Sequence, residues 1–353
     1  MDYPRIIVDT KKVLQNVKTI VNMANEKGIG IAGVTKGFCA IEEIVNAYVE
    51  GGVKYLVDSR IQNLKKLEKF NVPKILSRLP MISEAEDVVK YADISLVSEV
   101  DTIKALSEVA TKLNKTHRII IMIDLGDLRE GYFIEEEVYQ AVEETIRLKG
   151  IEIAGIGTNL TCYGGLIPDE ELLHRLVVIG DRINDKFGIE LEIISGGNSS
   201  SLHLLKNGNL EGINNLRLGD SLMRGTESAY DQLIPNTYND AFTLEVEIVE
   251  IKDKPSVAQG KIGRDAFGNI PTFIDRGVRK RIICAIGKQD IDFDTIFPID
   301  KDLIILGGSS DHLIIDGSDS KIEYRIGDII KFNMEYVSIL RATTSSYVKK
   351  VII

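Results

Sequence analysis

Short apolar runs alternate with longer segments of helical periodicity from about residue 10 to residue 230. In the longer segments, such as Ser98–Leu113 and Glu135–Leu148, apolar residues recur near i, i+3 and i+4. The apolar runs that predict strands are Gly30–Thr35, Lys54–Val57, Pro73–Ser77, Asp93–Val97, Arg118–Asp124, Ile151–Gly157, Leu191–Ser195 and Asn215–Gly219. Eight consecutive strand-and-helix units favour a closed (β/α)8 barrel over an open sheet. A strand at Arg5–Val8 and a helix at Thr10–Asn25 precede the barrel.

The pattern changes after Pro235, where short β-branched runs are separated by Gly, Asp or Asn turns. The strands predicted in this part are Thr243–Ile251, Arg281–Ala285, Leu303–Leu306, His312–Asp316 and Ile329–Asn333. No helix is expected among them. The predicted fold class is therefore α/β, with an N-terminal (β/α)8 TIM-type barrel over residues 1–235. A mainly-β C-terminal domain is predicted over residues 236–353.

Composition narrows the range of partners. The chain has 353 residues, of which 44% are hydrophobic and 27% charged, and a net charge of -10. This acidic balance disfavours nucleic-acid binding and leaves a small-molecule substrate as the better expectation. Three widely separated cysteines and four histidines without ligand spacing argue against disulfides and a metal site. No signal peptide and no apolar run of ~20 residues is evident, so a cytoplasmic protein without membrane contact is expected.

A single lysine stands where the first barrel strand ends. The run Ile31–Val34 leads to Thr35, Lys36 and Gly37. In (β/α)8 barrels the functional groups lie on the loops that follow the strands. Most lysines at strand ends are merely solvated, whereas an enzyme places one there when an amine must lose its charge to act. The lysine becomes informative only together with the loops at the other end of the barrel sequence.

The loops after the seventh and eighth strands are rich in glycine and serine. They are Ser195–Ser201 and Leu218–Leu222. Loops at these positions in barrels often hold a phosphate, because small residues allow close approach and helix N-termini offer free N–H groups. A single loop of this type is more often a simple helix cap, but two on neighbouring strands favour a phosphorylated ligand.

Two arginines accompany the lysine and the two glycine-serine loops. Arg217 lies within the last strand, and Arg129 follows the fifth strand among acidic neighbours. Each is explained either by an internal ion pair or by a ligand in the barrel mouth. Pyridoxal 5′-phosphate needs an amine for its aldehyde, an anion site for its phosphate and a partner for its ring nitrogen. Lys36, the two loops and Arg217 would supply all three on one face.

The motifs resemble those of the alanine racemase superfamily, the fold type III pyridoxal-phosphate enzymes. Within it they are most similar to the ornithine racemase branch. The resemblance covers nearly the whole chain and is carried by Val34–Gly37, Asp58–Arg60, Leu125–Gly131, Gly196–Ser199, Leu216–Gly219 and Leu306–His312.

The resemblance implies a role for each matching residue. Lys36 would form the Schiff base with the cofactor and act as one of two racemisation bases. Arg217 would face the pyridine nitrogen and keep it unprotonated, because a guanidinium only donates hydrogen bonds. Arg129 would lie near the cofactor phenolate and the substrate carboxylate. The residues implied around the cofactor phosphate are Asn198, Ser199, Gly219, Asp220, Ser221 and Tyr336.

The chain departs from alanine racemases at several positions. Their second base is a tyrosine from the partner subunit, and the corresponding stretch here is Gly287–Asp290. Lys288 is the candidate for this base if its pKa is lowered well below ~10.4. The alternatives are Asp290, His312 or a tyrosine such as Tyr163. Asn159 stands at a cofactor-contacting position where alanine racemases usually carry a histidine.

These departures argue against alanine as the preferred substrate. A longer, cationic substrate needs acceptors for its terminal ammonium. Asp290, Asp311 and His312 are the substrate-binding candidates, although each aspartate is equally well explained as a turn residue.

The resemblance therefore implies a pyridoxal-phosphate amino-acid racemase that interconverts L- and D-ornithine by two-base transfer of the Cα proton. Racemases of lysine, of alanine or of broad specificity are the nearest alternatives. A decarboxylase and a non-catalytic pyridoxal-phosphate-binding protein are more distant ones. A homodimer is expected, in which residues 236–353 contribute to the interface and to the active site.

Overall fold

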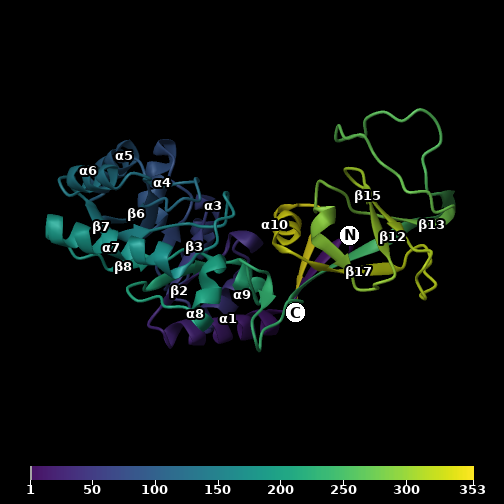
Figure 1. The fold of residues 1–353 in the computed structure, drawn as a ribbon, viewed down its shortest axis with the longest axis horizontal. Helices are drawn as coiled ribbons and strands as arrows, with labels where there is room; N and C mark the ends of the chain where they lie inside the picture. Colours follow the sequence, from purple (N-terminus) through teal and green to yellow (C-terminus); the bar gives the residue numbers. More distant parts are fainter. Residues whose placement is uncertain (1) are drawn as a thin grey trace. The chain divides into compact units, whose positions relative to one another are not determined.

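The computed structural model describes residues 2–353, apart from the side chain of Asn207. The chain forms two compact units (Figure 1). One unit comprises Thr10–Asn239, and the other comprises Asp240–Ile353 together with the N-terminal residues up to Asp9. We refer to them as the barrel unit and the C-terminal unit.

Eight parallel strands close into the barrel that the sequence predicts. They are β2 (Gly30–Val34), β3 (Tyr55–Asp58), β4 (Lys74–Leu76), β5 (Ile94–Val97), β6 (His117–Met122), β7 (Ile151–Gly157), β8 (Ile193–Ser195) and β9 (Asn215–Leu218). Closure comes from parallel pairing of β2 with β9, in which Ala32 stands opposite Arg217. The fold-class prediction is confirmed for this unit.

Helices follow the strands in sequence. They are α1 (Thr10–Asn25), α2 (Glu42–Glu50), α3 (Ile61–Leu67), α4 (Ala85–Tyr91), α5 (Val100–Lys112), α6 (Glu135–Thr145), α7 (Glu170–Phe187), α8 (His203–Asn207) and α9 (Asp220–Arg224). The stripe Val13, Val17, Ile20 and Ala24 is buried on α1, as the helical period requires. Among residues 2–353, no helix has both the length and the apolar character of a membrane span.

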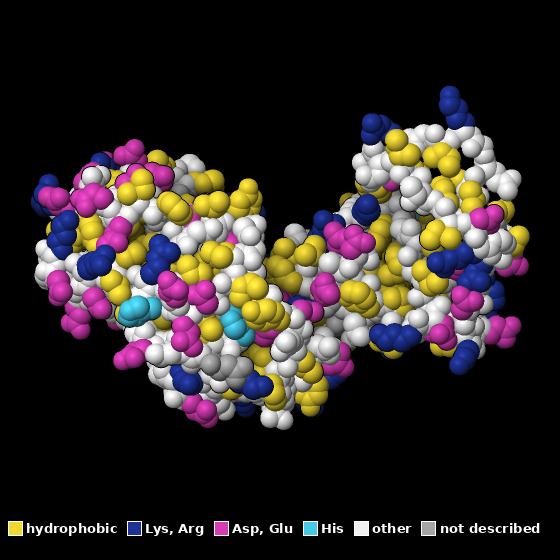
Figure 2. Space-filling view, in the orientation of Figure 1, with side chains coloured by type: hydrophobic (Ala, Val, Ile, Leu, Met, Phe, Trp, Pro, Cys, Tyr) yellow, Lys and Arg dark blue, Asp and Glu magenta, His cyan; other side chains and the backbone are white. Residues whose placement is uncertain are grey.

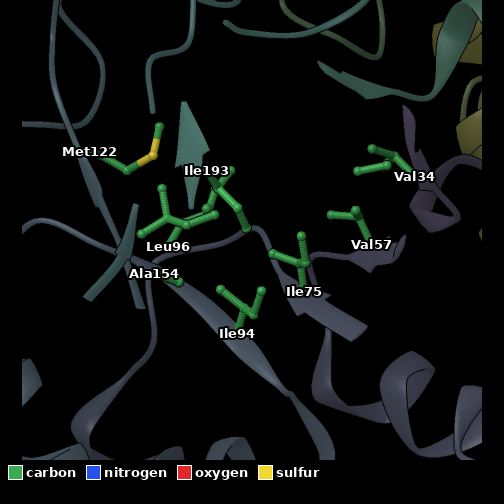
Figure 3. Packing of buried hydrophobic residues seen from close by; sticks show 10 residues of the cluster. Val34, Val57, Ile75, Ile94, Leu96, Met122, Ala154 and Ile193 are labelled. Atoms are coloured by element: carbon green, nitrogen blue, oxygen red, sulfur yellow. The ribbon is translucent and has the colours of Figure 1, made fainter. Parts of the chain in front are cut away.

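Side chains fill the interior of the barrel (Figure 3). The buried cluster contains Ala32, Val34, Val57, Ile75, Ile94, Leu96, Ile120, Met122, Ala154 and Ile193. Because this interior is packed, polar side chains can gather only at the ends of the strands. Acidic and basic side chains are interspersed on the face of the barrel unit seen in Figure 2.

The C-terminal unit is mainly antiparallel sheet, also as predicted. Its central strand order is β14-β17-β12-β13-β16-β15. The strands are β12 (Phe242–Pro255), β13 (Val278–Cys284), β14 (Ile296–Pro298), β15 (Ile304–Gly308), β16 (Leu313–Asp316), β17 (Ile329–Met334) and β18 (Lys349–Ile352). The short pair β10 (Thr226–Glu227) and β11 (Gln232–Leu233) belongs to the barrel unit.

Two features of the C-terminal unit differ from expectation. Strand β1 (Arg5–Val8) pairs antiparallel with β12 and parallel with β18, so the first residues belong to this unit and not to the barrel. The expectation that no helix interrupts the β domain is wrong, because α10 spans Tyr336–Thr344. Its β-branched residues disfavour a helix locally, but burial of Ile339 and Ala342 overrides that propensity.

The pairing of β1 generates a stability prediction. Ile6→Ala removes a fully buried side chain and should lower the free energy of unfolding of the C-terminal unit by about 2–5 kcal/mol. Ile353→Ala, at a residue that is 62% exposed, should change it by less than about 0.5 kcal/mol. Urea unfolding followed by circular dichroism measures both. Equal effects of the two substitutions would contradict the placement of β1 in this core.

Candidate active site

Lys36 is held at the carboxyl end of β2 by the residue before it. The backbone N–H of Thr35 donates to the carbonyl of Val57 at 2.7 Å, and its hydroxyl donates to Oδ2 of Asp58 at 2.6 Å. Lys36 then opens a 3-10 turn that ends at Phe38. The residue directly before Lys36 is thus tied to the end of the neighbouring strand β3.

Asp58 is a fully buried carboxyl at that strand end. Besides the Thr35 hydroxyl it accepts hydrogen bonds from the backbone N–H of Arg60 at 2.9 Å and from the side-chain amide of Asn63 at 3.1 Å. Burial raises the pKa of Asp58, and these hydrogen bonds oppose that shift. The carboxyl therefore orders the start of the loop that carries Lys36.

The amine of Lys36 has a lowered pKa. Burial of the ammonium is the largest cause, and the nearby Arg129 lowers the pKa further. Cys162, Asp58 and Glu130 act in the opposite direction. An amine with these neighbours loses its proton more readily than an exposed lysine, which suits a nucleophile or a base.

Arg217 is buried in β9, and among the described residues it forms no salt bridge. Its guanidinium donates to the carbonyl of Thr158 at 2.5 Å and to the hydroxyl of Ser195. Burial lowers the pKa of Arg217 to about 10, so the group is still charged at neutral pH. An internal ion pair, one of the two explanations considered above, does not account for this arginine.

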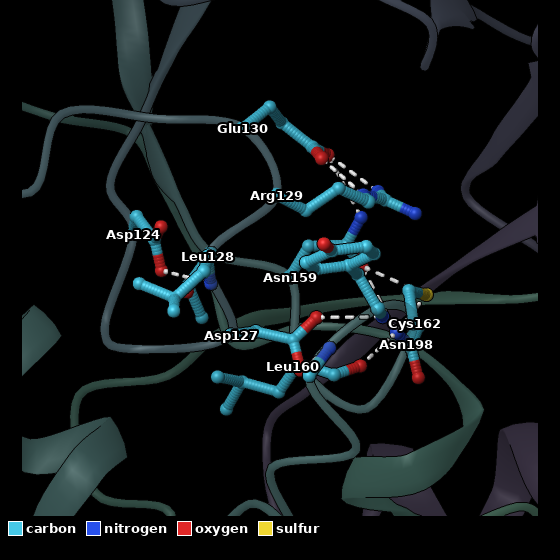
Figure 4. Close-up of polar contacts among 12 residues, drawn as sticks. Asp124, Asp127, Leu128, Arg129, Glu130, Asn159, Leu160, Cys162 and Asn198 are labelled. Atoms are coloured by element: carbon cyan, nitrogen blue, oxygen red, sulfur yellow. Dashed lines mark hydrogen bonds and ion pairs between the residues drawn. The ribbon is translucent and has the colours of Figure 1, made fainter.

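A polar network joins the loops after β6, β7 and β8 (Figure 4). Arg129 pairs through two nitrogens with both oxygens of Glu130. The amide of Asn159 donates to Oε1 of Glu130 at 2.9 Å, and the amide of Asn198 donates to Oδ1 of Asn159 at 2.9 Å. Three loops that are distant in sequence are therefore fixed relative to one another.

The serine-rich loops after β8 and β9 also meet. The backbone N–H of Ser221 donates to the hydroxyl of Ser199 at 3.2 Å. The hydroxyls of Ser200 and Ser221 are buried and have no hydrogen-bond partner among the described residues. A Cβ on Gly219 would lie 3.2 Å from Cβ of Val34, so a side chain there would crowd β2. Buried hydroxyls without partners fit a polar ligand, and a phosphate would supply the missing acceptors.

Asp220 differs in its surroundings from the other predicted phosphate residues. Its carboxylate accepts hydrogen bonds from Arg224 at 2.7 and 3.0 Å and from the hydroxyl of Ser228 at 2.9 Å. The carboxylate thus stabilises the short helix α9 and the residues after it. Only the backbone N–H of Asp220 is then available to contact a phosphate.

The predicted residues after position 235 lie in the C-terminal unit. The ammonium of Lys288 stands 4.3 Å from the ring centre of Phe267 and 5.9 Å from that of Phe293. Asp290 is buried and accepts a hydrogen bond from the hydroxyl of Ser345 at 2.6 Å. This serine already occupies an acceptor position of Asp290.

Asp311 and His312 are exposed neighbours, with Nδ1 of the histidine 3.7 Å from the carboxylate. Asp311 also accepts a hydrogen bond from the hydroxyl of Ser309 at 2.9 Å. Tyr336 is the first residue of α10. Tyr163, an alternative second base, is in the barrel unit and is 74% exposed.

Sequence reasoning missed Glu130, Asp58 and Cys162 as members of the Lys36 environment. Asp58 ends β3, so the rule that functional groups follow barrel strands was a signal for it. Glu130 was considered only as an acidic neighbour of Arg129.

Comparison with known proteins identifies the family. Residues 8–226 match the family model described as "Alanine racemase, N-terminal domain". The chain belongs to the alanine racemase family. It is 52% identical to an ornithine racemase of Acetoanaerobium sticklandii and 40% identical to a lysine racemase of Thermotoga maritima. Each alignment covers 99% of both chains. The resemblance inferred from the motifs is confirmed.

Solved structures of family members share the fold. An alanine racemase of Clostridium difficile matches with a TM-score of 0.74 and 18% identity, covering 100% of this chain and 96% of the other. An alanine racemase of Bartonella henselae with covalently bound pyridoxal phosphate matches with a TM-score of 0.73 and 18% identity, covering 99% of both chains. The barrel mouth fits this cofactor. Among the described residues it offers a half-buried amine, buried hydroxyls without hydrogen-bond partners and an arginine without a carboxylate partner.

The environment of Lys36 yields a pH prediction. Because its pKa is lowered from 10.5, its amine in the cofactor-free protein should be acetylated at lower pH than a lysine in an unstructured peptide. Arg129→Gln removes a positive neighbour and should shift this labelling profile to higher pH. Mass spectrometry of the Lys36 peptide after brief treatment with acetic anhydride gives the profile.

Arg147→Gln is the matched control, because this exposed arginine pairs with Glu143 and is not among the groups that shift the pKa of Lys36. It should leave the profile unchanged. A shift to lower pH in Arg129→Gln would show that the charge of Arg129 does not act on Lys36 as described.

Proposed function

We propose that this protein is a pyridoxal-phosphate-dependent amino-acid racemase that interconverts L- and D-ornithine. The observation that carries the proposal is the half-buried Lys36 amine with a lowered pKa, at the mouth of a barrel that also holds Arg217 without a carboxylate partner. The 52% identity to an ornithine racemase over 99% of both chains supports the substrate.

When bound, pyridoxal phosphate withdraws electrons from the amino acid and so acidifies its Cα proton. Lys36 would hold the cofactor through its amine until the amino group of the substrate takes its place. The released, neutral amine of Lys36 would then accept the Cα proton on one face. Arg217 donates hydrogen bonds toward the pyridine nitrogen and accepts none, so it keeps that nitrogen unprotonated. A weaker electron sink favours return of the proton to Cα over side reactions such as transamination.

The remaining site residues are part of the proposal. Arg129 and Asn159 contact the cofactor, and Arg129 also receives the substrate carboxylate. The phosphate is held by Asn198, Ser199, Gly219, Asp220, Ser221 and Tyr336, partly through backbone N–H groups. Lys288 returns the proton on the opposite face, with Asp290 or His312 as alternatives. Asp290, Asp311 and His312 are also candidates to contact the substrate.

Lysine is the second candidate substrate, because the lysine racemase of T. maritima is 40% identical over 99% of both chains. The departures from alanine racemases at Asn159 and around Lys288 argue against alanine. A panel of L-amino acids analysed by chiral chromatography separates ornithine, lysine and alanine.

We further propose a cytoplasmic homodimer. The barrel unit, Thr10–Asn239, is its catalytic barrel. The C-terminal unit contributes to the subunit interface and completes the partner's site. The three cysteines, Cys39, Cys162 and Cys284, are all free thiols, which suits a reducing compartment.

Replacing the lysine tests the chemistry. Lys36→Ala should lower the rate of D-ornithine formation by more than about a thousandfold, because one group serves both cofactor attachment and proton transfer. The visible absorbance of the bound cofactor should change with it, and borohydride should no longer fix the cofactor to the chain. Lys69→Ala, at an exposed lysine paired with Glu42, is the control. Full activity in Lys36→Ala would overturn the assignment.

Complementation tests the shared site. Dimers mixed from Lys36→Ala and Lys288→Ala chains would contain one site with both lysines if the two groups come from different subunits. Subunit exchange at equal concentrations should then restore about a quarter of the wild-type activity. No recovery would mean that each site is built within one chain, and an active Lys288→Ala parent would exclude Lys288 as the second base.

A further inference from the structure

Glu130 is a carboxylate at the barrel mouth that the reaction described above does not use. Its side chain is 12% exposed, and its hydrogen bonds are made with two side chains, those of Arg129 and Asn159. Its charge also acts on Lys36 and Arg217, where it opposes the lowering of the pKa that burial causes. The group therefore lies within the polar cluster around the reacting amine.

The other carboxylates of this cluster each accept hydrogen bonds from backbone N–H groups of the loops. Asp127 accepts from the N–H groups of Tyr163, Gly164 and Leu166 at 3.0 to 3.2 Å. Asp124 accepts from the backbone of its own loop at 2.8 and 3.1 Å. Asp58 accepts from the Thr35 hydroxyl and from the backbone N–H of Arg60, just before α3. Asp124 and Asp127 are labelled in Figure 4. These three carboxylates hold loop backbone in place. Among residues 2–353, the Glu130 carboxylate has hydrogen bonds only with the side chains of Arg129 and Asn159, which can rearrange.

Glu130 has acceptor capacity left. Oε1 receives Arg129 and Asn159, whereas Oε2 receives only Nε of Arg129. An ionised carboxylate offers about four lone-pair positions on its two oxygens. One further donor can therefore bind to Oε2 without displacing either side chain.

Glu130 also borders an acidic hollow in the barrel unit. The hollow has a volume of about 660 Å³. Its lining includes Tyr132, the outer glutamates Glu99, Glu137 and Glu144, the carboxylates Asp101 and Glu130, and two cations, Lys104 and Arg129. Burial and these three outer glutamates raise the pKa of Tyr132 to about 12, so the phenol stays neutral. A hollow with this lining favours a cationic group over an anionic or apolar one.

We propose that Glu130 determines substrate specificity by accepting a hydrogen bond from the side-chain ammonium of the diamino-acid substrate, which extends toward the acidic hollow. The inference rests on the proposed racemase function and adds the residue that selects a charged side chain. An ammonium that leaves water needs a carboxylate partner. Glu130 is the carboxylate of this cluster that both keeps an acceptor position and lines the acidic hollow.

Glu130→Gln tests the inference with ornithine and norvaline, which share a carbon chain and differ by the terminal ammonium. The substitution should lower kcat/KM for ornithine by about tenfold to a hundredfold, the range for loss of a charge-assisted hydrogen bond. The value for norvaline should change by less than about twofold. Glu136→Gln, at an exposed glutamate on α6, removes the same charge and should alter neither.

A positioning role for Glu130 gives a different result. If the carboxylate only holds Arg129, both substrates lose the same factor, and this outcome overturns the inference. Glu130→Asp keeps the charge and should keep the preference for ornithine. Loss of that preference in the aspartate variant, with an unchanged melting temperature, would also count against the proposal.

Binding separates failure of the inference from failure of the proposed function. Ornithine should raise the melting temperature of the wild-type holoenzyme more than norvaline does, and Glu130→Gln should remove the difference. If wild type racemises neither compound, the proposed function fails, but this binding difference still supports the role of Glu130. Equal stabilisation by both ligands in wild type would overturn it.

Discussion

The parallel hydrogen bonds between β2 and β9 are the constraint on which the site depends. Lys36 follows β2 and Arg217 lies on β9, opposite Ala32 in the register of that pairing. The two residues are far apart in the sequence and come to adjacent strands only because the first and last strands close the barrel. With closure, the loops after every strand also face one edge, so the glycine-serine loops, Arg129 and Asp58 reach the same mouth.

Desolvation at this mouth has a different consequence for each cation. Burial lowers the pKa of Lys36, which makes its amine available as a base or nucleophile. Arg217 is buried more completely, yet its pKa stays at about 10 and the group remains charged. The amine of Lys36 can therefore take up and release a proton, whereas the guanidinium of Arg217 keeps its proton and its charge. The carboxylates of Asp58 and Glu130 limit how far these cations repel one another.

Local pattern was enough to predict most of the fold, but not the features that depend on distant partners. The eight barrel strands each show as an apolar run, and α1 was predicted with its observed bounds because its buried stripe is regular. Strand β1 was also recognised, yet its place in the C-terminal sheet depends on β12 and β18, more than 230 residues away. Helix α10 was missed because packing of Ile339 outweighs a β-branched composition.

In the candidate site, too, some residues can be predicted from local sequence and others depend on distant partners. Lys36 and Arg217 stand out in sequence, since a lone charge beside an apolar strand needs a reason. Glu130 does not stand out, because its contacts with Asn159 and its influence on Lys36 arise from loops after three different strands. A mouth that holds Lys36, Arg129 and Arg217 repels a second ammonium unless a carboxylate offsets them. Binding of a diamino acid therefore depends on the charges of the whole loop cluster. Glu130, which supplies the offsetting negative charge, can be identified only once the positions of these loops are known.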